Sequence, residues 1–249
     1  KVLNQEDTKK VLDMKEVIKT VEEVYRAKSA GDTEVFPLVF HEFQPGAADM
    51  DIKSGWLKSS NIFGLKLVSW FGDNVKKNLP ALIGTVMIFD AGTGAPIGIL
   101  DGSHITGMRT GAAGAIGAKL LARKNSKRLL VVGAGHIAQF QVAATLQCFP
   151  QLEEVMIYDG VDYALAEELH QGIDLCGGAS PVFGRESIKR QVANPVTGRG
   201  LDCPAHGLHT PDMTFETLQP VLRGPASVAV HDNGDVSRYA FLLAHSMQI

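Results

Sequence analysis

The stretch RLLVVGAGHIAQFQVAATL, residues 128–146, decides the fold. Its four apolar residues Leu129–Val132 predict a buried strand, and the apolar spacing from Ile137 to about Cys148 predicts a helix. A second strand, Val155–Tyr158, and a further helix follow. This alternation indicates a βαβ unit, in which consecutive strands run parallel and a helix packs across them. We therefore predict an α/β fold with a Rossmann-type sheet.

A glycine turn joins the first strand to its helix in the pattern Gly-x-Gly-x-x-Ala, made by Gly133, Gly135 and Ala138. In a dinucleotide site the first glycine allows the tight turn, the second lets backbone approach a pyrophosphate, and the small third residue lets helix pack on strand. The second strand ends in Asp159, 24 residues after Gly135, where an acid can bind an adenosine ribose. A turn that only packs a helix on a sheet is the alternative, but this context favours a dinucleotide.

The residue after Asp159 indicates which of the two nicotinamide cofactors, NAD or NADP, is preferred. Gly160 stands where an arginine would hold the 2′-phosphate of NADP, so NAD is favoured over NADP. His136 lies inside the turn, and we expect its backbone N–H rather than its ring to matter. The predicted cofactor contacts are Gly133, Gly135, His136, Ile137, Ala138, Asp159 and Thr110.

The composition, 249 residues with 45% hydrophobic and 20% charged, is that of a globular protein with one large core or two smaller ones. The formal net charge is -3 and the basic residues are dispersed, which argues against nucleic acid or anionic membrane as a partner. No apolar run approaches the roughly 18 residues of a membrane span, and the first residues do not resemble a secretory signal. The three cysteines are widely separated and indicate no disulfide framework and no metal site. We expect a cytoplasmic protein with a small-molecule partner.

The chain before the glycine turn follows another pattern. A helix is predicted to start after Asp13 and to stop at Gly31. Short extended segments between Phe36 and Leu100 predict an antiparallel sheet or partial barrel. The segment Ile105–Lys124 is so rich in glycine and alanine that a helix there implies a closely packed neighbouring backbone.

For four charged residues in this part, the alternatives are a solvated position and a functional role. Lys66 shares a strand face with Trp70, and the residues alone favour a solvated sheet edge over a polar pocket. Arg109 lies near the start of the small-residue helix, where the helix dipole favours anions. A cation at this place is therefore unfavourable on its own. An anionic ligand bound to Arg109 would compensate for it; the alternative is an ion pair with an acid. Asp49 and Asp51 are expected in a solvated loop.

Four segments in order resemble the ornithine cyclodeaminase and mu-crystallin family: GLKLVSWFGDN, LPALIGTVMIFDAGTGAPIGILDG, ITGMRTGAAGAIGAKLLAR and VVGAGHIAQFQ. The resemblance runs from about Val2 to Gln171. It implies an α+β substrate-binding and dimerisation domain, residues 1–123, which residues from about 235 to 249 would complete. It also implies a Rossmann domain, residues 124–234, and a homodimer.

The resemblance assigns roles to individual residues. Lys66 and Arg109 fall on the lysine and arginine that hold the substrate carboxylate in the family. For Lys66 this replaces the prediction of a solvated sheet edge. Asp202, in GLDCPAHGL, falls on the catalytic aspartate, and Lys66 is also placed at the catalytic centre. Asp49 takes the place of a glutamate near the distal amino group of the substrate.

The chain also departs from the family pattern. Pro37 is not followed by the expected arginine, and Ala81 replaces a carboxylate-binding threonine of the cyclodeaminases. Between Asp159 and Asp202 the chain is several tens of residues shorter than the pattern. These changes remove two expected carboxylate contacts and alter how the Rossmann sheet is completed.

The implied chemistry is hydride transfer between NAD and the α-carbon of a small amino acid or imino acid, with Asp202 moving the proton. The leading hypothesis is cyclodeamination of L-ornithine to L-proline and ammonia. The alternatives are an NAD(P)-dependent amino-acid dehydrogenase or imine reductase, and a non-catalytic binding protein of the mu-crystallin kind.

Overall fold

The computed structural model describes residues 1–159, 164, 168–169, 189–193, 227–231 and 240–242. The chain forms two compact units, one of residues 1–109 and one that begins at Thr110. The unit boundary therefore falls inside the small-residue helix. The proposed domain ranges, 1–123 and 124–234, stay a prediction.

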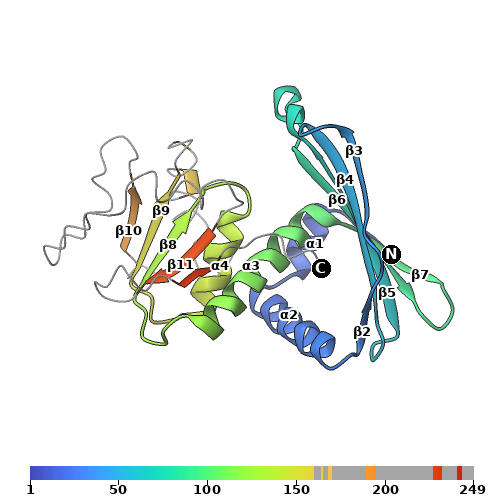
Figure 1. The fold of residues 1–249 in the computed structure, drawn as a ribbon, viewed down its shortest axis with the longest axis horizontal. Helices are drawn as coiled ribbons and strands as arrows, with labels where there is room; N and C mark the ends of the chain where they lie inside the picture. The colour runs from blue at the N-terminus through green and yellow to red at the C-terminus, as the bar shows by residue number, and fades with distance from the viewer. Residues whose placement is uncertain (160–163, 165–167, 170–188, 194–226, 232–239, 243–249) are drawn as a thin grey trace, which may run out of the picture. The chain divides into compact units, whose positions relative to one another are not determined.

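Two helices open the first unit (Figure 1). α1, Gln5–Val11, begins with a capping box that the sequence analysis did not find. α2, Met14–Ser29, begins after Asp13, whose carboxylate accepts hydrogen bonds from two backbone N–H groups of the first turn. The chain leaves α2 through Gly31, whose φ of 77° lies in the left-handed region. The predicted start and end of this helix are confirmed.

Seven strands form one sheet in the order β1-β7-β6-β5-β4-β2, with β3 also paired to β4. Every pairing is antiparallel except that between β1 and β7. The predicted antiparallel sheet is confirmed, and the described strands close no barrel. The strands are β1 Val2–Leu3, β2 Thr33–Val35, β3 Val39–Gln44, β4 Ala48–Leu57, β5 Ile62–Phe71, β6 Leu82–Asp90 and β7 Pro96–Asp101, and the 3-10 helix η1, Gly72–Lys77, follows β5.

Strand β4 overturns the prediction that Asp49 and Asp51 lie in a solvated loop. Both acids belong to a ten-residue strand that pairs with β5 along its whole length. The segment Asp-Met-Asp-Ile-Lys alternates polar and apolar residues, which is the period of a strand. Its polar members, including Lys53, share one face of the sheet. A neighbouring glycine-containing turn and two acids favoured a loop in the sequence, but the alternation was the better signal.

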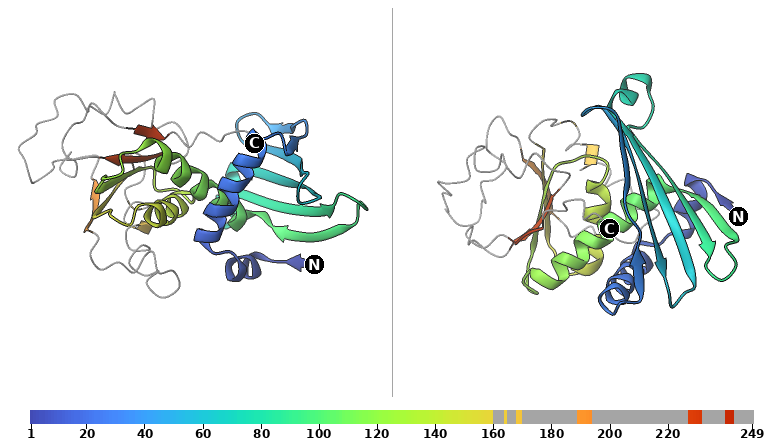
Figure 2. Two further views of the ribbon diagram at one scale, coloured as in Figure 1. Left: turned by 90° about the horizontal axis from the view of Figure 1, so that it is seen from below. Right: turned by 45° about the vertical axis from the view of Figure 1, so that its right-hand side comes forward.

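The two faces of this sheet differ (Figures 1 and 2). α2 and the first turns of α3, Gly102–Leu121, lie along the face that carries Lys66. Strand alternation turns Leu67, Ile83 and Ile99 to the opposite face, where each is at least 36% exposed. One face of the sheet is therefore covered by helices, and among the described residues the other face exposes apolar side chains, which we call the open face.

The second unit contains the predicted βαβ arrangement. β8, Arg128–Val132, pairs in parallel with β9, Glu154–Tyr158, and α4, Ala138–Cys148, connects them in sequence. β10, Lys189–Ala193, pairs in parallel with β9. The core of this unit is made by buried apolar residues of β8, α4 and β9: Leu129, Val131, Val142, Leu146, Val155 and Ile157. These elements confirm the α/β class and the parallel half of a Rossmann-type sheet.

The other edge of this sheet is not parallel. β11, Ser227–His231, runs antiparallel to β8, and β12, Ala240–Leu242, runs antiparallel to β11. The order is β10-β9-β8-β11-β12. The described strands therefore form a mixed sheet, whereas a complete Rossmann sheet continues in parallel on both sides of its first strand.

The small-residue helix α3 packs closely on its neighbours, as predicted. In the first unit, a Cβ atom on Gly102 would lie 2.7 Å from the carbonyl carbon of Gly84 in β6. In the second unit, a Cβ on Gly111 would overlap the carbonyl group of Phe140 in α4. Because real Cβ atoms do not approach backbone so closely, these positions require glycine.

Replacing Gly111 with alanine tests this packing. Alanine is the better helix former, so a loose contact would make the variant more stable. Because the Phe140 carbonyl belongs to helical backbone and cannot move aside, we expect the free energy of unfolding to fall by about 1–3 kcal/mol in urea denaturation. Gly98→Ala is the control, since its Cβ would meet its nearest neighbour at 3.5 Å. A Gly111→Ala protein as stable as the wild type would contradict the packing.

Candidate functional site

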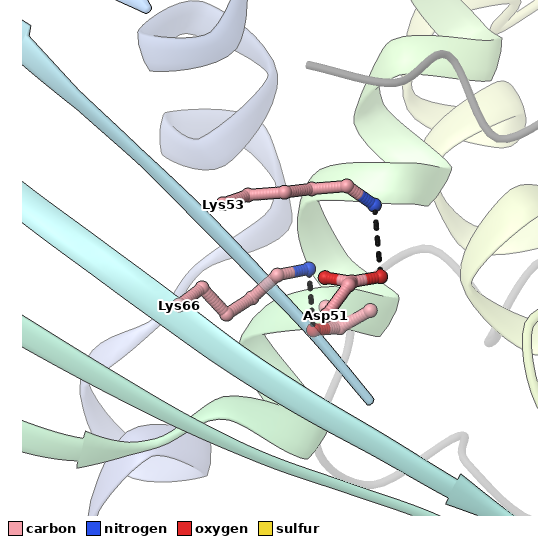
Figure 3. Close-up of polar contacts among 4 residues, drawn as sticks. Asp51, Lys53 and Lys66 are labelled. Atoms are coloured by element: carbon pink, nitrogen blue, oxygen red, sulfur yellow. Dashed lines mark hydrogen bonds and ion pairs between the residues drawn. The ribbon is translucent and has the colours of Figure 1, made fainter. Parts of the chain in front are cut away.

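The first unit gathers charged side chains on the helix-covered face of its sheet (Figure 3). Lys53 of β4 and Lys66 of β5 stand directly opposite each other in the strand register. Asp51 lies two residues before Lys53 and therefore on the same face. α3 adds Thr106 and Arg109. Strand pairing and the close seat of α3 on β6 fix the places of these residues.

Lys66 is a partly buried ammonium group and not part of a solvated edge. It lies on a strand with a partner on either side, and its Nζ donates a hydrogen bond to Oγ1 of Thr106 at 3.3 Å. Burial lowers the pKa of Lys66 to about 8, helped by repulsion from Arg109 and Lys53 and opposed by Asp51. The group is therefore mostly protonated at neutral pH and still has N–H donors to offer a ligand.

Arg109 supplies a second cation on this face. Burial lowers its pKa, and the phenol of Tyr25 and the carboxylate of Asp51 act in the opposite direction. The prediction that Arg109 lies near the helix start is wrong, because α3 begins at Gly102, about two turns earlier. The helix dipole acts within the first turn and gives no conflict here. No described acid lies within ion-pair distance of Arg109, and the predicted alternative of an ion pair stays a prediction.

Asp51 and Lys53 form an ion pair that was not predicted from the sequence. Nζ of Lys53 lies 3.2 Å from Oδ2 of Asp51, and the two side chains are only 20% and 25% exposed. Oδ1 of Asp51 is fully buried and has no hydrogen-bond partner among the described residues. Such an oxygen carries charge without a donor to match it, which costs free energy unless a nearby cation compensates.

Asp49 lies on the same face but nearer the start of β4, before Asp51 and Lys53. It stands opposite Trp70 of β5, four residues from Lys53. At about 3.3 Å per residue this is roughly 13 Å from the row that holds Lys66. Asp51 is therefore the acid closer to that row. The role of Asp49 near a distal amino group stays a prediction.

In the second unit, the glycine turn has the features of a nucleotide-binding loop. Gly133 has a φ of 90°, so the tight turn does need glycine there. A Cβ on Gly135 would meet nothing within 4 Å, and α4 starts without a side-chain cap. Gly135 leaves space beside the helix start, where the N–H groups of Ala138 and Phe140 donate to backbone carbonyls. A helix start of this kind favours an anion such as a pyrophosphate. These residues fit a dinucleotide.

Asp159 is nearly buried beside this turn. Its Oδ2 accepts a hydrogen bond of 2.8 Å from the backbone N–H of Ala134, so the carboxylate ties the end of the second strand to the glycine turn. In dinucleotide-binding proteins an acid at this position of the sequence accepts hydrogen bonds from the ribose hydroxyls. The proposed ribose contact itself stays a prediction.

The remaining predicted cofactor residues lie close to the same turn or helix. His136 is exposed, and its ring contacts Phe140 edge-on with centroids 5.3 Å apart. Ile137 precedes the first residue of α4, and the carbonyl of Thr110 accepts a hydrogen bond of 3.3 Å from Gln141. Their contacts with a cofactor stay predictions. Asp202 lies outside the described residues.

The described part of the chain contains neither a membrane-spanning helix nor a cluster of metal-binding residues. None of its helices is both long and apolar enough to cross a membrane. No group of three or more histidine, cysteine, aspartate or glutamate residues there could hold a metal ion.

Comparison with known proteins places the chain in a family. Residues 1–172 match the model of the ornithine cyclodeaminase/mu-crystallin family, and the chain belongs to that family. It is 35% identical to alanine dehydrogenase of Archaeoglobus fulgidus over 158 residues. The aligned residues make up 64% of this chain and 48% of the relative. The chain spans about half the length of the curated relatives that it matches.

Solved structures show the same fold. Thermococcus litoralis Δ1-pyrroline-2-carboxylate reductase in complex with NADH and L-proline matches with a TM-score of 0.69 at 29% identity, over 77% of this chain and 56% of the other. An archaeal alanine dehydrogenase dimer with bound NAD matches with a TM-score of 0.67 at 31% identity, over 78% and 56%. The α/β fold with its mostly antiparallel first sheet is therefore that of the family.

The lowered pKa of Lys66 leads to a prediction about stability. A partly buried cation beside two other cations costs folding free energy, so we expect Lys66→Met to raise the melting temperature. A gain of about 1 kcal/mol would raise it by roughly 2–4 °C in a protein of this size. Lys19→Met, at an exposed position of α2, is the control. A lower melting temperature for Lys66→Met, measured by calorimetry, would show that Lys66 contributes to stability.

Proposed function

We propose that this protein is an NAD-dependent oxidoreductase that acts at the α-carbon of a small imino acid or amino acid. The observation that carries the proposal is the pair of partly buried cations, Lys66 and Arg109, on one face of the first unit. A carboxylate is the ligand that two such cations favour. The glycine turn of the second unit, with Asp159 beside it, supports NAD as the cofactor.

The proposed reaction is reduction of a carbon–nitrogen double bond. When bound, NADH would supply the hydride; the α-carbon of the imino acid would accept it and the nitrogen would take up one proton, which gives an amino acid. Lys66 and Arg109 hold the carboxylate and fix the orientation of the α-carbon, which is a large source of rate acceleration. By its resemblance to the family aspartate, Asp202 is our candidate for the proton donor.

Two relatives favour reduction over cyclodeamination. Both are named as oxidoreductases: a dehydrogenase of alanine and a reductase of Δ1-pyrroline-2-carboxylate. Cyclodeamination of L-ornithine, the leading hypothesis from the sequence, therefore becomes the second candidate. Asp49 supports it, because it places a carboxylate on the site face of β4 where a distal amine could extend. A non-catalytic binding protein is the third.

The activity is tested with Δ1-pyrroline-2-carboxylate and NADH. We expect one NADH to be oxidised for each L-proline formed, measured by absorbance and by amino-acid analysis. Pyruvate with ammonia, which gives an acyclic imine, tests the alanine dehydrogenase reaction. We expect Arg109→Met to lower kcat/KM at least roughly 30-fold, because it removes one cation of the carboxylate site.

The control and the competing outcomes are distinct. Arg26→Met, which removes an exposed arginine paired with Glu22 on α2, leaves kcat/KM unchanged. Proline and ammonia formed from L-ornithine with only catalytic NAD would establish cyclodeamination instead. Binding of NADH without turnover of any of these compounds would favour a binding protein.

We also propose that the protein forms a homodimer through the open face of its first sheet. Leu67, Ile83 and Ile99 point to this face from three neighbouring strands, and each is at least 36% exposed. Several exposed apolar side chains on one face are typical of a protein interface. A dimer is also the form named for the archaeal alanine dehydrogenase.

Substitution on this face tests the dimer. We expect the double variant Leu67→Lys, Ile83→Lys to elute as a monomer in size-exclusion chromatography with light scattering, while the wild type has twice that mass. Val75→Lys, at an exposed apolar position of η1, is the control and remains dimeric. A wild type that is monomeric at micromolar concentration would contradict the proposal.

A further inference from the structure

The charges around Lys66 are unbalanced. Lys53 stands opposite Lys66 in the strand register, and like charges in that position repel each other. Arg109 adds a third cation from α3. The described acid that acts on both Lys66 and Arg109 is Asp51. One carboxylate therefore compensates a group of three cations.

The two oxygens of this carboxylate have different surroundings. Oδ2 is held by Lys53 at 3.2 Å, and the ion pair fixes the side chain on the inner face of the sheet. Oδ1 is buried and has no described hydrogen-bond partner. Figure 3 shows Lys53 and Lys66 extending over the face that carries Asp51; the carboxylate is within ion-pair distance of Lys53, while the described hydrogen bond of Lys66 goes to Thr106. Lys66 has one described hydrogen bond, at 3.3 Å to Thr106, so its remaining N–H groups can turn toward other acceptors.

We propose that Asp51 is a positioning residue for Lys66: Lys53 holds one carboxylate oxygen, and the buried second oxygen keeps the Lys66 ammonium charged and in place to bind the substrate carboxylate. The inference rests on the proposed function, in which Lys66 binds that carboxylate. Asp51 acts through Lys66 and does not itself contact the substrate.

The proposal predicts that removing the charge of Asp51 and removing that of Lys53 change the pKa of Lys66 in opposite directions. Asp51 raises the pKa of Lys66, whereas Lys53 and Arg109 lower it and burial lowers it further. Removing the charge of Asp51 must therefore lower the pKa of Lys66 below about 8, and removing that of Lys53 must raise it. A purely structural role for the pair would give no such opposition.

The direct test is the titration of Lys66 in the full-length protein. The 13Cε resonance of Lys66, assigned by its loss in Lys66→Arg, is followed by NMR from pH 6 to pH 11. We expect Asp51→Asn, which keeps the shape of the side chain, to lower the pKa by at least about 0.3 unit, and Lys53→Met to raise it. Asp51→Glu, which restores the charge, returns the value toward that of the wild type.

The matched control is Asp73→Asn, which removes a carboxylate that is exposed and paired with Lys76 on η1. It leaves the pKa of Lys66 unchanged. A decrease of less than about 0.3 unit in Asp51→Asn, or an increase, would overturn the proposal. If Asp51→Asn does not fold, Asp51→Ser, which also removes the carboxylate charge, is titrated in its place, and a pKa of Lys66 that is unchanged or higher overturns the proposal.

A second measurement separates this inference from the proposed function. Pyrrole-2-carboxylate is a planar carboxylate whose ring nitrogen does not titrate in this range, so the pH dependence of its affinity reports on the protein. We expect its affinity, measured by calorimetry with NADH present, to fall as the pH rises through about 8 in the wild type and at lower pH in Asp51→Asn. Absence of binding would contradict the carboxylate site and hence the proposed function, whereas the NMR titration alone decides whether Asp51 controls the charge of Lys66.

Discussion

The arrangement of charged groups around Lys66 depends on one contact, which lies between two glycines. Gly84 in β6 and Gly102 at the start of α3 bring strand and helix backbones so close that Gly102 has no room for a side chain and a Cβ on Gly84 would be tightly packed. This contact sets the height of α3 above the sheet. Thr106 and Arg109, one and two turns further along the helix, then reach the face on which Lys66 lies. Small residues at the start of α3 therefore determine the geometry of polar groups further along it.

The group of cations around Lys66 also carries a cost in stability. Lys53, Lys66 and Arg109 would be easier to accommodate in solvent, and the lowered pKa of two of them reflects the cost of burial. The strand pairing of β4 with β5 and the packing of α2 and α3 keep them together nonetheless. A carboxylate ligand removes part of this cost by neutralising charge, so binding and folding are coupled through the same electrostatic free energy.

Much of the fold follows from local sequence. The strand, glycine turn and helix around Gly133 were predicted because apolar period, turn residue and helix start agree over a short segment. Asp13 and Gly31 marked the ends of α2 for the same reason, and the small residues of α3 predicted its close packing. The antiparallel β11 was not predicted, since strand direction depends on contacts between segments far apart in the chain.

The site was predictable only in part. Lys66 and Arg109 were identified by resemblance, because neither charge has a local pattern that distinguishes a ligand from a solvated residue. Asp51 and Lys53 depend on the register of β4 against β5, which a single sequence does not reveal. The bond from Ala134 to Asp159 has a practical consequence for redesign of the nucleotide site. Asp159 joins the loop to the strand, so a substitution meant to admit a 2′-phosphate would also release the loop, and cofactor preference here cannot be changed independently of loop conformation.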